Sequence, residues 1–193
     1  MSLWKTLVGR WGSGTGEVDD VRIDASTNSL QTISYEHHEV HAGSHYTCVD
    51  NATLNAAEVL DTLIYTPNTT KYMHLIFEAH GALHTQVDMY EGSSHNASGS
   101  KTCRNNNRNY DDTPTTTLNT TALDGSHGTN IYVTQFGIDA GGGANRVTSG
   151  GAVRGSEEWI LKPNERYLVR VTSLTASNPV SIRFSWYEHA DKH

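Results

Sequence analysis

The sequence predicts an all-β fold, an antiparallel β-sandwich, on the grounds of composition and periodicity. Apolar residues make up 36% and charged residues only 18% of the 193 residues, so Thr, Ser, Asn and Gly fill the balance. That composition favours short strands and turns over helices. Several runs alternate apolar and polar residues, and no run with apolar residues at helical spacing extends beyond about two turns.

The clearest alternation lies in the last third of the chain. Residues 180–187 alternate apolar and polar side chains, as a strand with one buried face does, and residues 166–172 follow the same pattern. The four residues 176–179 between these runs form an even-length loop. An antiparallel hairpin with such a loop places Tyr167 near Trp186. We therefore expect these two runs to pair with each other.

A second alternating stretch, residues 72–92, predicts another hairpin. Its apolar residues are odd-numbered on both sides of the centre, so the loop is expected to be odd in length, with Gly81 in the left-handed region. One such register places His74 opposite Asp88 on the exposed face.

Further strands complete the expected sandwich, and one long polar stretch interrupts it. Residues 93–121 are too long for a passive connection, so they form either an excursion that contacts a partner or a disordered loop. About eight strands with turn-rich joints fit a two-sheet sandwich, of which the jelly roll is the common large form. The additional strands are expected within residues 19–35, 51–66, 131–136 and 157–161.

The length suits one domain with an appended arm. Residues 1–30 carry several glycines together with Trp4 and Trp11 and show no steady periodicity. We interpret them as an N-terminal arm whose tryptophans bury on a neighbouring chain or back on the domain, and a loose terminus is the alternative. Residues 31–193 are assigned to the sandwich domain.

The charge balance excludes two classes of partner. A net charge of −7 with no basic patch argues against nucleic acid and against anionic membranes, because both require clustered Lys and Arg. Residues 3–8 are too short to form the core of a signal peptide, and no stretch approaches the roughly 20 apolar residues that span a bilayer. We expect a soluble protein.

The two cysteines, Cys48 and Cys103, are too few for a disulfide framework or for a zinc site of their own. We expect both to be reduced if the protein is made in a cytosol.

The histidine cluster between His37 and His45 is the most suggestive feature for chemistry. If this stretch is a strand, His37, Glu39 and His41 line one face and could bind zinc or nickel. A solvated or inter-subunit strand face is the preferred interpretation, because the spacing within residues 38–41 is one residue short of the metalloprotease motif. Cupins, which are metal-binding jelly rolls, carry a Gly-led pair of alternating histidines, a downstream glutamate, and a later histidine in a second motif that contains Gly and Pro. Here only the alternation of His37, Glu39 and His41 is matched. We therefore assign no catalytic, cofactor-binding or metal-binding residue, expect no cofactor, and do not expect an enzyme.

Six motifs carry a family resemblance, at residues 20–27, 30–33, 35–46, 67–71, 105–109 and 186–189. They resemble a family of structural proteins encoded by tailed bacteriophages, and the resemblance covers most of residues 19–189. It implies a virion component of jelly-roll type, a decoration or cement protein on the capsid exterior that is assembled in the host cytoplasm. It implies no catalytic residues.

The partners expected from this resemblance are the major capsid protein and further copies of the same chain, as a homotrimer. Residues 1–30 would then anchor the protein on the capsid or on a neighbouring subunit. The alternative is a receptor- or glycan-binding module of a phage head fibre or tail, in which Tyr110 and the polar loops 93–128 form a sugar-binding platform.

Overall fold

A computed structural model describes residues 35–122, 124–138 and 158–190. The chain divides into two units, Met1–His38 and Glu39–His193, and the β-structure belongs to the second. The predicted N-terminal arm, residues 1–30, lies outside the described residues, as does nearly all of the strand pattern expected within residues 19–35.

The predicted antiparallel β-sandwich is confirmed. Strands dominate the described residues, and every paired strand runs antiparallel to its neighbours. The elements are helix α1 (Tyr35–Ala42) and strands β1 (His45–Leu54), β2 (Val59–Tyr65), β3 (Lys71–Gly81), β4 (Thr85–Glu91), β5 (Ala97–Ser100), β6 (Arg104–Asn105), β7 (Thr117–Thr121), β8 (Thr129–Phe136), β9 (Trp159–Leu161), β10 (Arg166–Ser173) and β11 (Asn178–Ala190).

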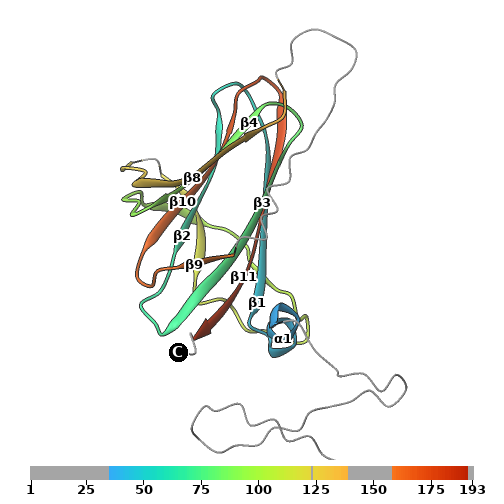
Figure 1. The fold of residues 1–193 in the computed structure, drawn as a ribbon, viewed down its shortest axis with the longest axis vertical. Coiled ribbons are helices and arrows are strands. Elements are labelled where there is room, and N and C mark those ends of the chain that lie inside the picture. The colour runs from blue at the N-terminus through green and yellow to red at the C-terminus, as the bar shows by residue number, and fades with distance from the viewer. Residues whose placement is uncertain (1–34, 123, 139–157, 191–193) are drawn as a thin grey trace, which may run out of the picture. The chain divides into compact units, whose positions relative to one another are not determined.

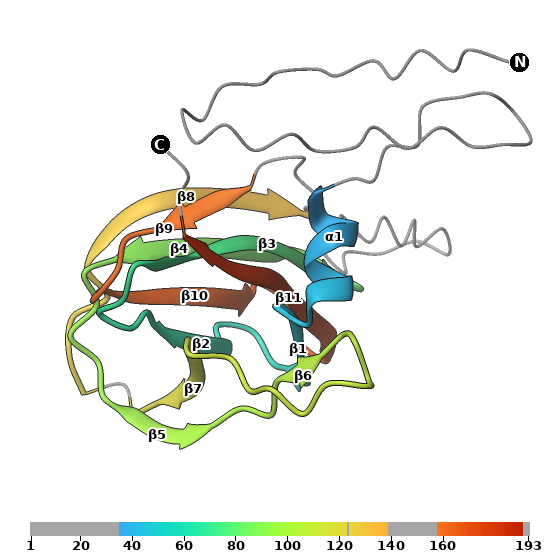
Figure 2. The same cartoon turned by 90° about the horizontal axis from the view of Figure 1, so that it is seen from below.

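The strands form two sheets that pack face to face (Figure 1). Sheet 1 has the strand order β6-β1-β11-β3-β9, and sheet 2 has the order β5-β7-β2-β10-β4-β8. Figure 2 shows β5, β6 and β7 at one lateral end of the sandwich, with β8 and β9 at the other.

Most connections cross between the sheets, so both predicted hairpins are wrong. Strands β3 and β4 belong to different sheets, as do β10 and β11. Alternation shows which face of a strand is buried, but two strands that face one core from opposite sheets have the same alternation as two paired strands. Tyr167 and Trp186 are therefore both buried, yet each lies in its own sheet.

Gly81 and His74 also differ from the hairpin prediction. Gly81 does not adopt a positive φ angle; instead, a Cβ atom at this position would lie 2.1 Å from Oγ1 of Thr85. The glycine is needed for close approach and not for a tight turn. His74 is not opposite Asp88, and its Nδ1 lies 3.1 Å from Oε1 of Glu158.

The core fills the space between the sheets. Trp186 of β11 is completely buried, and its ring centroid lies 5.7 Å from that of Tyr46 on β1. Further large side chains with little or no exposed surface come from both sheets, including Leu75, Phe184 and Ile182 of sheet 1 and Ile64, Met89, Tyr167 and Val169 of sheet 2.

Sheet 1 brings the first and the last strand of the described chain, β1 and β11, next to each other. Strand β11 pairs with β1 from Leu54 opposite Asn178 to His45 opposite Tyr187, and it pairs with β3 along its other side. The last strand is thus the central strand of sheet 1. Sheet 1 cannot form its core-facing surface before β11 is in place.

The polar stretch after β4 is an ordered excursion that carries β5, β6 and β7. A buried carboxylate of β11, Glu188, holds its second half. The backbone N–H groups of Thr115 and Thr116 donate to this carboxylate at 2.9 and 2.8 Å, the hydroxyl of Thr115 donates to it, and the Trp186 indole N–H lies 3.4 Å away. One side chain therefore connects the excursion to the central strand.

We expect Glu188→Ala to lower the free energy of unfolding by about 2–4 kcal/mol, because it leaves the donors of Thr115 and Thr116 without their acceptor. Urea unfolding measures this. Asp111→Ala, which removes an exposed carboxylate from the same excursion, is the control and should change stability by roughly 0.5 kcal/mol at most. Equal midpoints for the two variants would contradict the role of Glu188.

Candidate functional site

The histidine cluster does not form one continuous strand, because only its last residue, His45, lies in β1. Residues Tyr35–Ala42 form helix α1, so the predicted alternating face of His37, Glu39 and His41 is wrong. At about 100° per residue, a helix turns every second side chain to nearly opposite sides. The three residues therefore do not converge as they would on one face of a strand.

Glu39 and His45 of this region form hydrogen bonds within the fold. Glu39 is buried, and its carboxylate accepts a hydrogen bond from the Ser44 hydroxyl. His45 is buried on β1, where Nδ1 lies 2.6 Å from Nδ2 of Asn106 and Nε2 lies 3.3 Å from Oγ of Ser185. Within residues 35–122, 124–138 and 158–190, no group of three His, Cys, Asp or Glu side chains is arranged to hold a metal ion.

Gly43 ends the helix and is the signal that the sequence prediction missed. Its N–H donates to Val40 O at 3.2 Å, and the next N–H, of Ser44, donates to Glu39 O at 3.1 Å, which is the Schellman arrangement. Gly43 has a φ of +75°, and a Cβ atom there would lie 2.8 Å from Cγ of Tyr110. The ring of Tyr110, proposed above as a sugar platform, thus packs against the helix cap while remaining 44% exposed.

We expect Gly43→Ala to destabilise the protein by about 2–4 kcal/mol, from the cost of a left-handed alanine plus the clash with Tyr110. Gly92→Ala is the matched control, because Gly92 has a φ of +76° and its Cβ would meet no atom within 4 Å. That variant should lose only about 1–2 kcal/mol. Equal losses in thermal or urea unfolding would show that Tyr110 does not constrain the cap.

The outward face of sheet 2 is covered in part by the chain itself. Residues 93–96 and 124–128 run beside each other there, and Gly125 N–H donates to Nδ1 of His95 at 2.9 Å. On this face Leu168 is fully buried, although it does not belong to the core between the sheets, and the ring of its cross-strand neighbour Tyr90 lies 5.2 Å from that of His127. This part of the outward face is therefore covered by the chain's own residues and contributes to the stability of the fold.

A row of charged side chains on the same outward face is also internally paired. Arg170 donates from Nε and Nη2 to the two oxygens of Asp61 at 2.8 and 2.7 Å, and this pairing raises the pKa of Arg170. Asp88 accepts from the amides of Gln86 and Asn130 at 2.8 and 2.9 Å. Because the buried carboxylates have their partners within the sheet, this row is a structural network.

Sheet 1 offers a more accessible surface, which we call the open face. It consists of outward-facing side chains on three adjacent strands, and Val49, on β1 at one side of it, is 58% exposed. The register places Val49 opposite Arg183, and Arg183 opposite Glu78. The open face comprises Val49, Asn51 and Thr53 of β1, Ser181 and Arg183 of β11, and Glu78 and His80 of β3.

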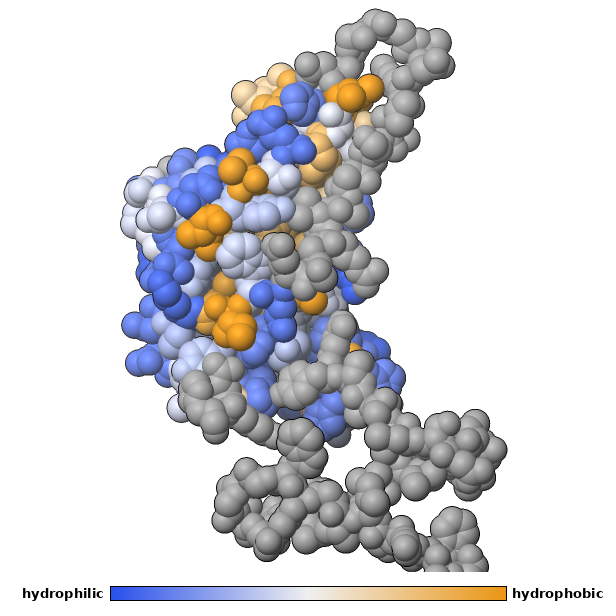
Figure 3. Space-filling view, viewed as in Figure 1, coloured by the Kyte–Doolittle hydropathy of each residue, from blue (hydrophilic) through white to orange (hydrophobic). Residues whose placement is uncertain are grey.

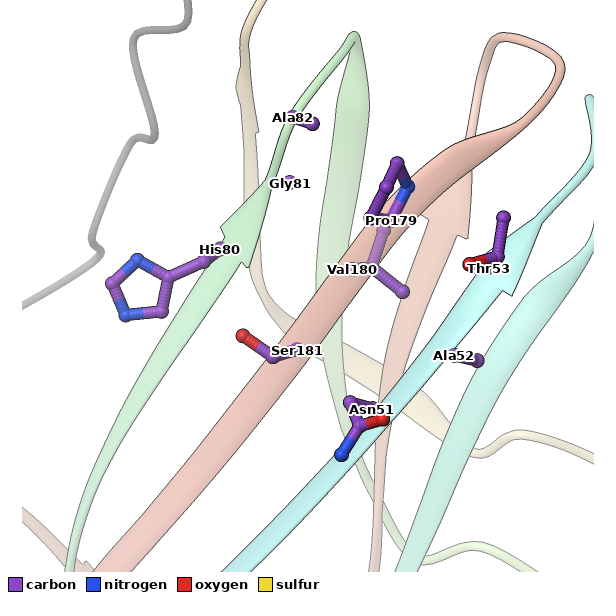
Figure 4. Close-up of a pocket in the computed structure, with 9 residues that line it drawn as sticks. All are labelled: Asn51, Ala52, Thr53, His80, Gly81, Ala82, Pro179, Val180 and Ser181. Atoms are coloured by element: carbon purple, nitrogen blue, oxygen red, sulfur yellow. The ribbon is translucent and has the colours of Figure 1, made fainter.

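A depression of about 520 Å³ lies at one end of the open face. Figure 4 shows that its lining comes from three strand ends, residues 51–53, 80–82 and 179–181. Asn51, Ser181 and His80 are opposite one another in register, with Ser181 in the middle.

This row does not have the arrangement of a serine nucleophile site. Such a site needs the histidine between the serine and a group that orients its ring, whereas here Ser181 lies between His80 and Asn51. The backbone of these strands is also engaged in the sheet ladder, so it offers no obvious pair of N–H groups to hold an oxyanion. The depression is better suited to contact than to catalysis.

Exposed hydrophobic side chains are dispersed over the described surface. On the face seen in Figure 3, hydrophobic residues form small separate groups among hydrophilic ones. Within the described part of the chain the only helix is α1, eight residues long, which is too short and too polar to cross a membrane. Among the described residues, the large hydrophobic side chains that are exposed are those of Val49, Tyr110, Val133, Ile138, Ile160 and Leu174.

Comparison with protein-family models, with curated proteins and with solved structures finds no match to this chain. The open face itself was not singled out from the sequence. Its signal is Val49, an apolar residue at an odd position of β1 whose neighbours on that face, Thr47 and Asn51, are polar.

Proposed function

We propose that this protein is a structural virion protein that binds the exterior of a bacteriophage capsid and stabilises the shell. The observation that carries the proposal is the open face, an exposed platform on strands that are paired along nearly their whole length. The resemblance of residues 20–46 to phage structural proteins supports the major capsid protein as the partner.

The proposal includes a jelly-roll topology, which the strand order supports. Without the excursion, sheet 1 reads β1-β11-β3-β9 and sheet 2 reads β2-β10-β4-β8. Each strand of one sheet thus has its chain neighbour in the other, except at the step from β4 to β8 across the excursion. Two interleaved four-stranded sheets of this kind are what a double Greek key produces.

The edges of the sheets suit a protein that is present in many copies on a shell. Three of the four edge strands, β5, β6 and β9, have two to four residues. Short edge strands offer little template for adding a strand from another chain. Neighbouring copies would then meet through side chains and not by continuous sheet formation.

The stabilising effect follows from linkage. A protein that binds only the assembled shell lowers the free energy of the assembled state by mass action. Durable attachment needs an interface above roughly 1,000 Å². In the open face, apolar Val49 lies opposite Arg183, and Arg183 lies opposite Glu78, so an exposed apolar side chain borders a charged pair.

Self-association as a homotrimer on the capsid exterior is part of the same proposal. Light scattering of the purified full-length chain tests it, and we expect a mass three times that of the 21.2 kDa monomer. A monomeric mass would remove the trimer from the proposal.

The binding experiment uses capsids that lack this protein. We expect the purified chain to co-sediment with them saturably and to raise the temperature at which the shells disrupt. We further expect Val49→Asp to weaken binding at least tenfold, because it replaces an exposed apolar contact of the interface with a charge, a cost of about 1.4 kcal/mol or more.

Val133→Asp is the matched control, because Val133 is 59% exposed on β8 of sheet 2. It should bind as the unmodified chain does. If both variants bind normally, a different surface contacts the shell. If the unmodified chain does not bind capsids at all, the proposed function is wrong.

The alternative is a glycan- or receptor-binding module of a head fibre or tail, and the exposure of Tyr110 favours it. Tyr110 lies in the excursion among polar residues and keeps 44% of its surface accessible. Saturable binding on a glycan array that Tyr110→Ala abolishes, together with no binding to capsids, would support this alternative.

A further inference from the structure

Cys48 and Cys103 lie far apart in the sequence, yet the fold brings them together. Cys48 belongs to β1 and is 2% exposed. Cys103 lies in the excursion between β5 and β6, is partly buried, and packs against the core cluster that contains Cys48. Both are free thiols in the structure.

The register of β1 and β6 places the two cysteines opposite each other. Strand β6 pairs Asn105 with Tyr46 and Arg104 with Thr47, so the next antiparallel step joins Cys103 to Cys48. The register continues beyond that step, because Lys101 forms an ion pair with Asp50. The cysteine pair is therefore held between a backbone ladder on one side and an ion pair on the other.

Directly opposed residues of antiparallel strands have Cα atoms about 4.5–5.5 Å apart, which lies within the range for disulfides. Their side chains also point to the same face. The alternation of β1 turns Cys48 inward with Tyr46, toward the core that Cys103 contacts.

The two thiols interact directly. A hydrogen bond from Cys103 lowers the pKa of Cys48, against the effect of burial, and nearby Lys101 lowers it further. The same interaction with Cys48 raises the pKa of Cys103. Within the pair, Cys48 is thus the better site for a thiolate.

We propose that Cys48 and Cys103 form an intrachain disulfide when the protein meets an oxidising thiol pool, and that this bond fixes the excursion to β1. The proposal rests on strand register and burial, and it is independent of the proposed capsid binding.

The reaction is a thiol–disulfide exchange with a small disulfide such as oxidised glutathione. The more accessible cysteine, Cys103, loses its proton to solvent and attacks one sulfur of the disulfide as the thiolate. A mixed disulfide forms, and one glutathione leaves as a thiolate that takes up a proton. The Cys48 thiolate then attacks the Cys103 sulfur, forms the intrachain bond and displaces the second glutathione. Two protein thiols are oxidised, and one glutathione disulfide is reduced to two thiols.

The bond would add a covalent link to a non-covalent attachment. On this side the excursion is held to β1 by the two residue pairs of β6, by the contact of Asn106 with His45 and by the ion pair of Lys101 with Asp50. The Asn105 side chain holds it to the helix cap by donating to Gly43 O at 2.7 Å. A covalent link at Cys103 lowers the conformational entropy of the unfolded chain and so favours the folded excursion.

The test equilibrates the full-length, fully reduced protein with oxidised glutathione, then alkylates it under denaturing conditions and analyses the peptides by mass spectrometry. We expect loss of both free thiols together, a cross-link between the peptides of Cys48 and Cys103, and no stable glutathione adduct. The midpoint of thermal unfolding should rise by roughly 5–10 °C relative to the reduced protein.

Two variants check the assignment. Cys48→Ala should stop at a glutathione adduct on Cys103, because the resolving thiolate is missing. Cys103→Ala should leave Cys48 free in the folded protein, because Cys48 is almost completely buried. Unchanged thiols in the unmodified protein, a persistent glutathione adduct on it, or cross-links only between two chains would each overturn the proposal.

Discussion

The structure depends on the position of β11 between β1 and β3. Its inward side chains, Ile182, Phe184 and Trp186, are almost completely buried and occupy the centre of the core. Its outward side chains, Ser181 and Arg183, belong to the open face. The same strand therefore supplies the packing that stabilises the sandwich and the surface proposed to contact the shell. Because β1 and β11 are distant in sequence, this pairing is the non-local step on which folding of sheet 1 depends.

The end of β11 also organises the excursion. Glu188 accepts the backbone N–H groups of Thr115 and Thr116, while β1, the direct neighbour of β11, carries the short pairing with β6 and the cysteine opposite Cys103. The excursion is thus attached at several points to the pair β1 and β11. A polar stretch with few apolar residues stays ordered because the sandwich supplies the buried partners that it lacks.

The fold class could be predicted from the sequence because burial imposes a local period of two. The alternation of Ile182, Phe184 and Trp186 with polar residues is visible without any knowledge of the partner strand. The partner could not be predicted, because β3 and β4, or β10 and β11, would show the same alternation in a hairpin or in opposite sheets.

The candidate site was less predictable for a related reason. Helix α1 lacks an apolar stripe, so only the cap at Gly43 marks it, and its histidines were assigned to a strand face. The open face and the cysteine pair both arise from registers between distant segments, such as Val49 opposite Arg183. No local pattern contains that information.

In the proposed complex, the outward face of sheet 1 contacts the capsid exterior. An electron cryomicroscopy reconstruction of decoration-free capsids incubated with this protein tests it most directly. We expect added density on the outer surface of the shell, with β1, β11 and β3 facing the capsid protein and Val49 at the contact. Capsids without added density, or a sandwich bound through the opposite sheet, would contradict it.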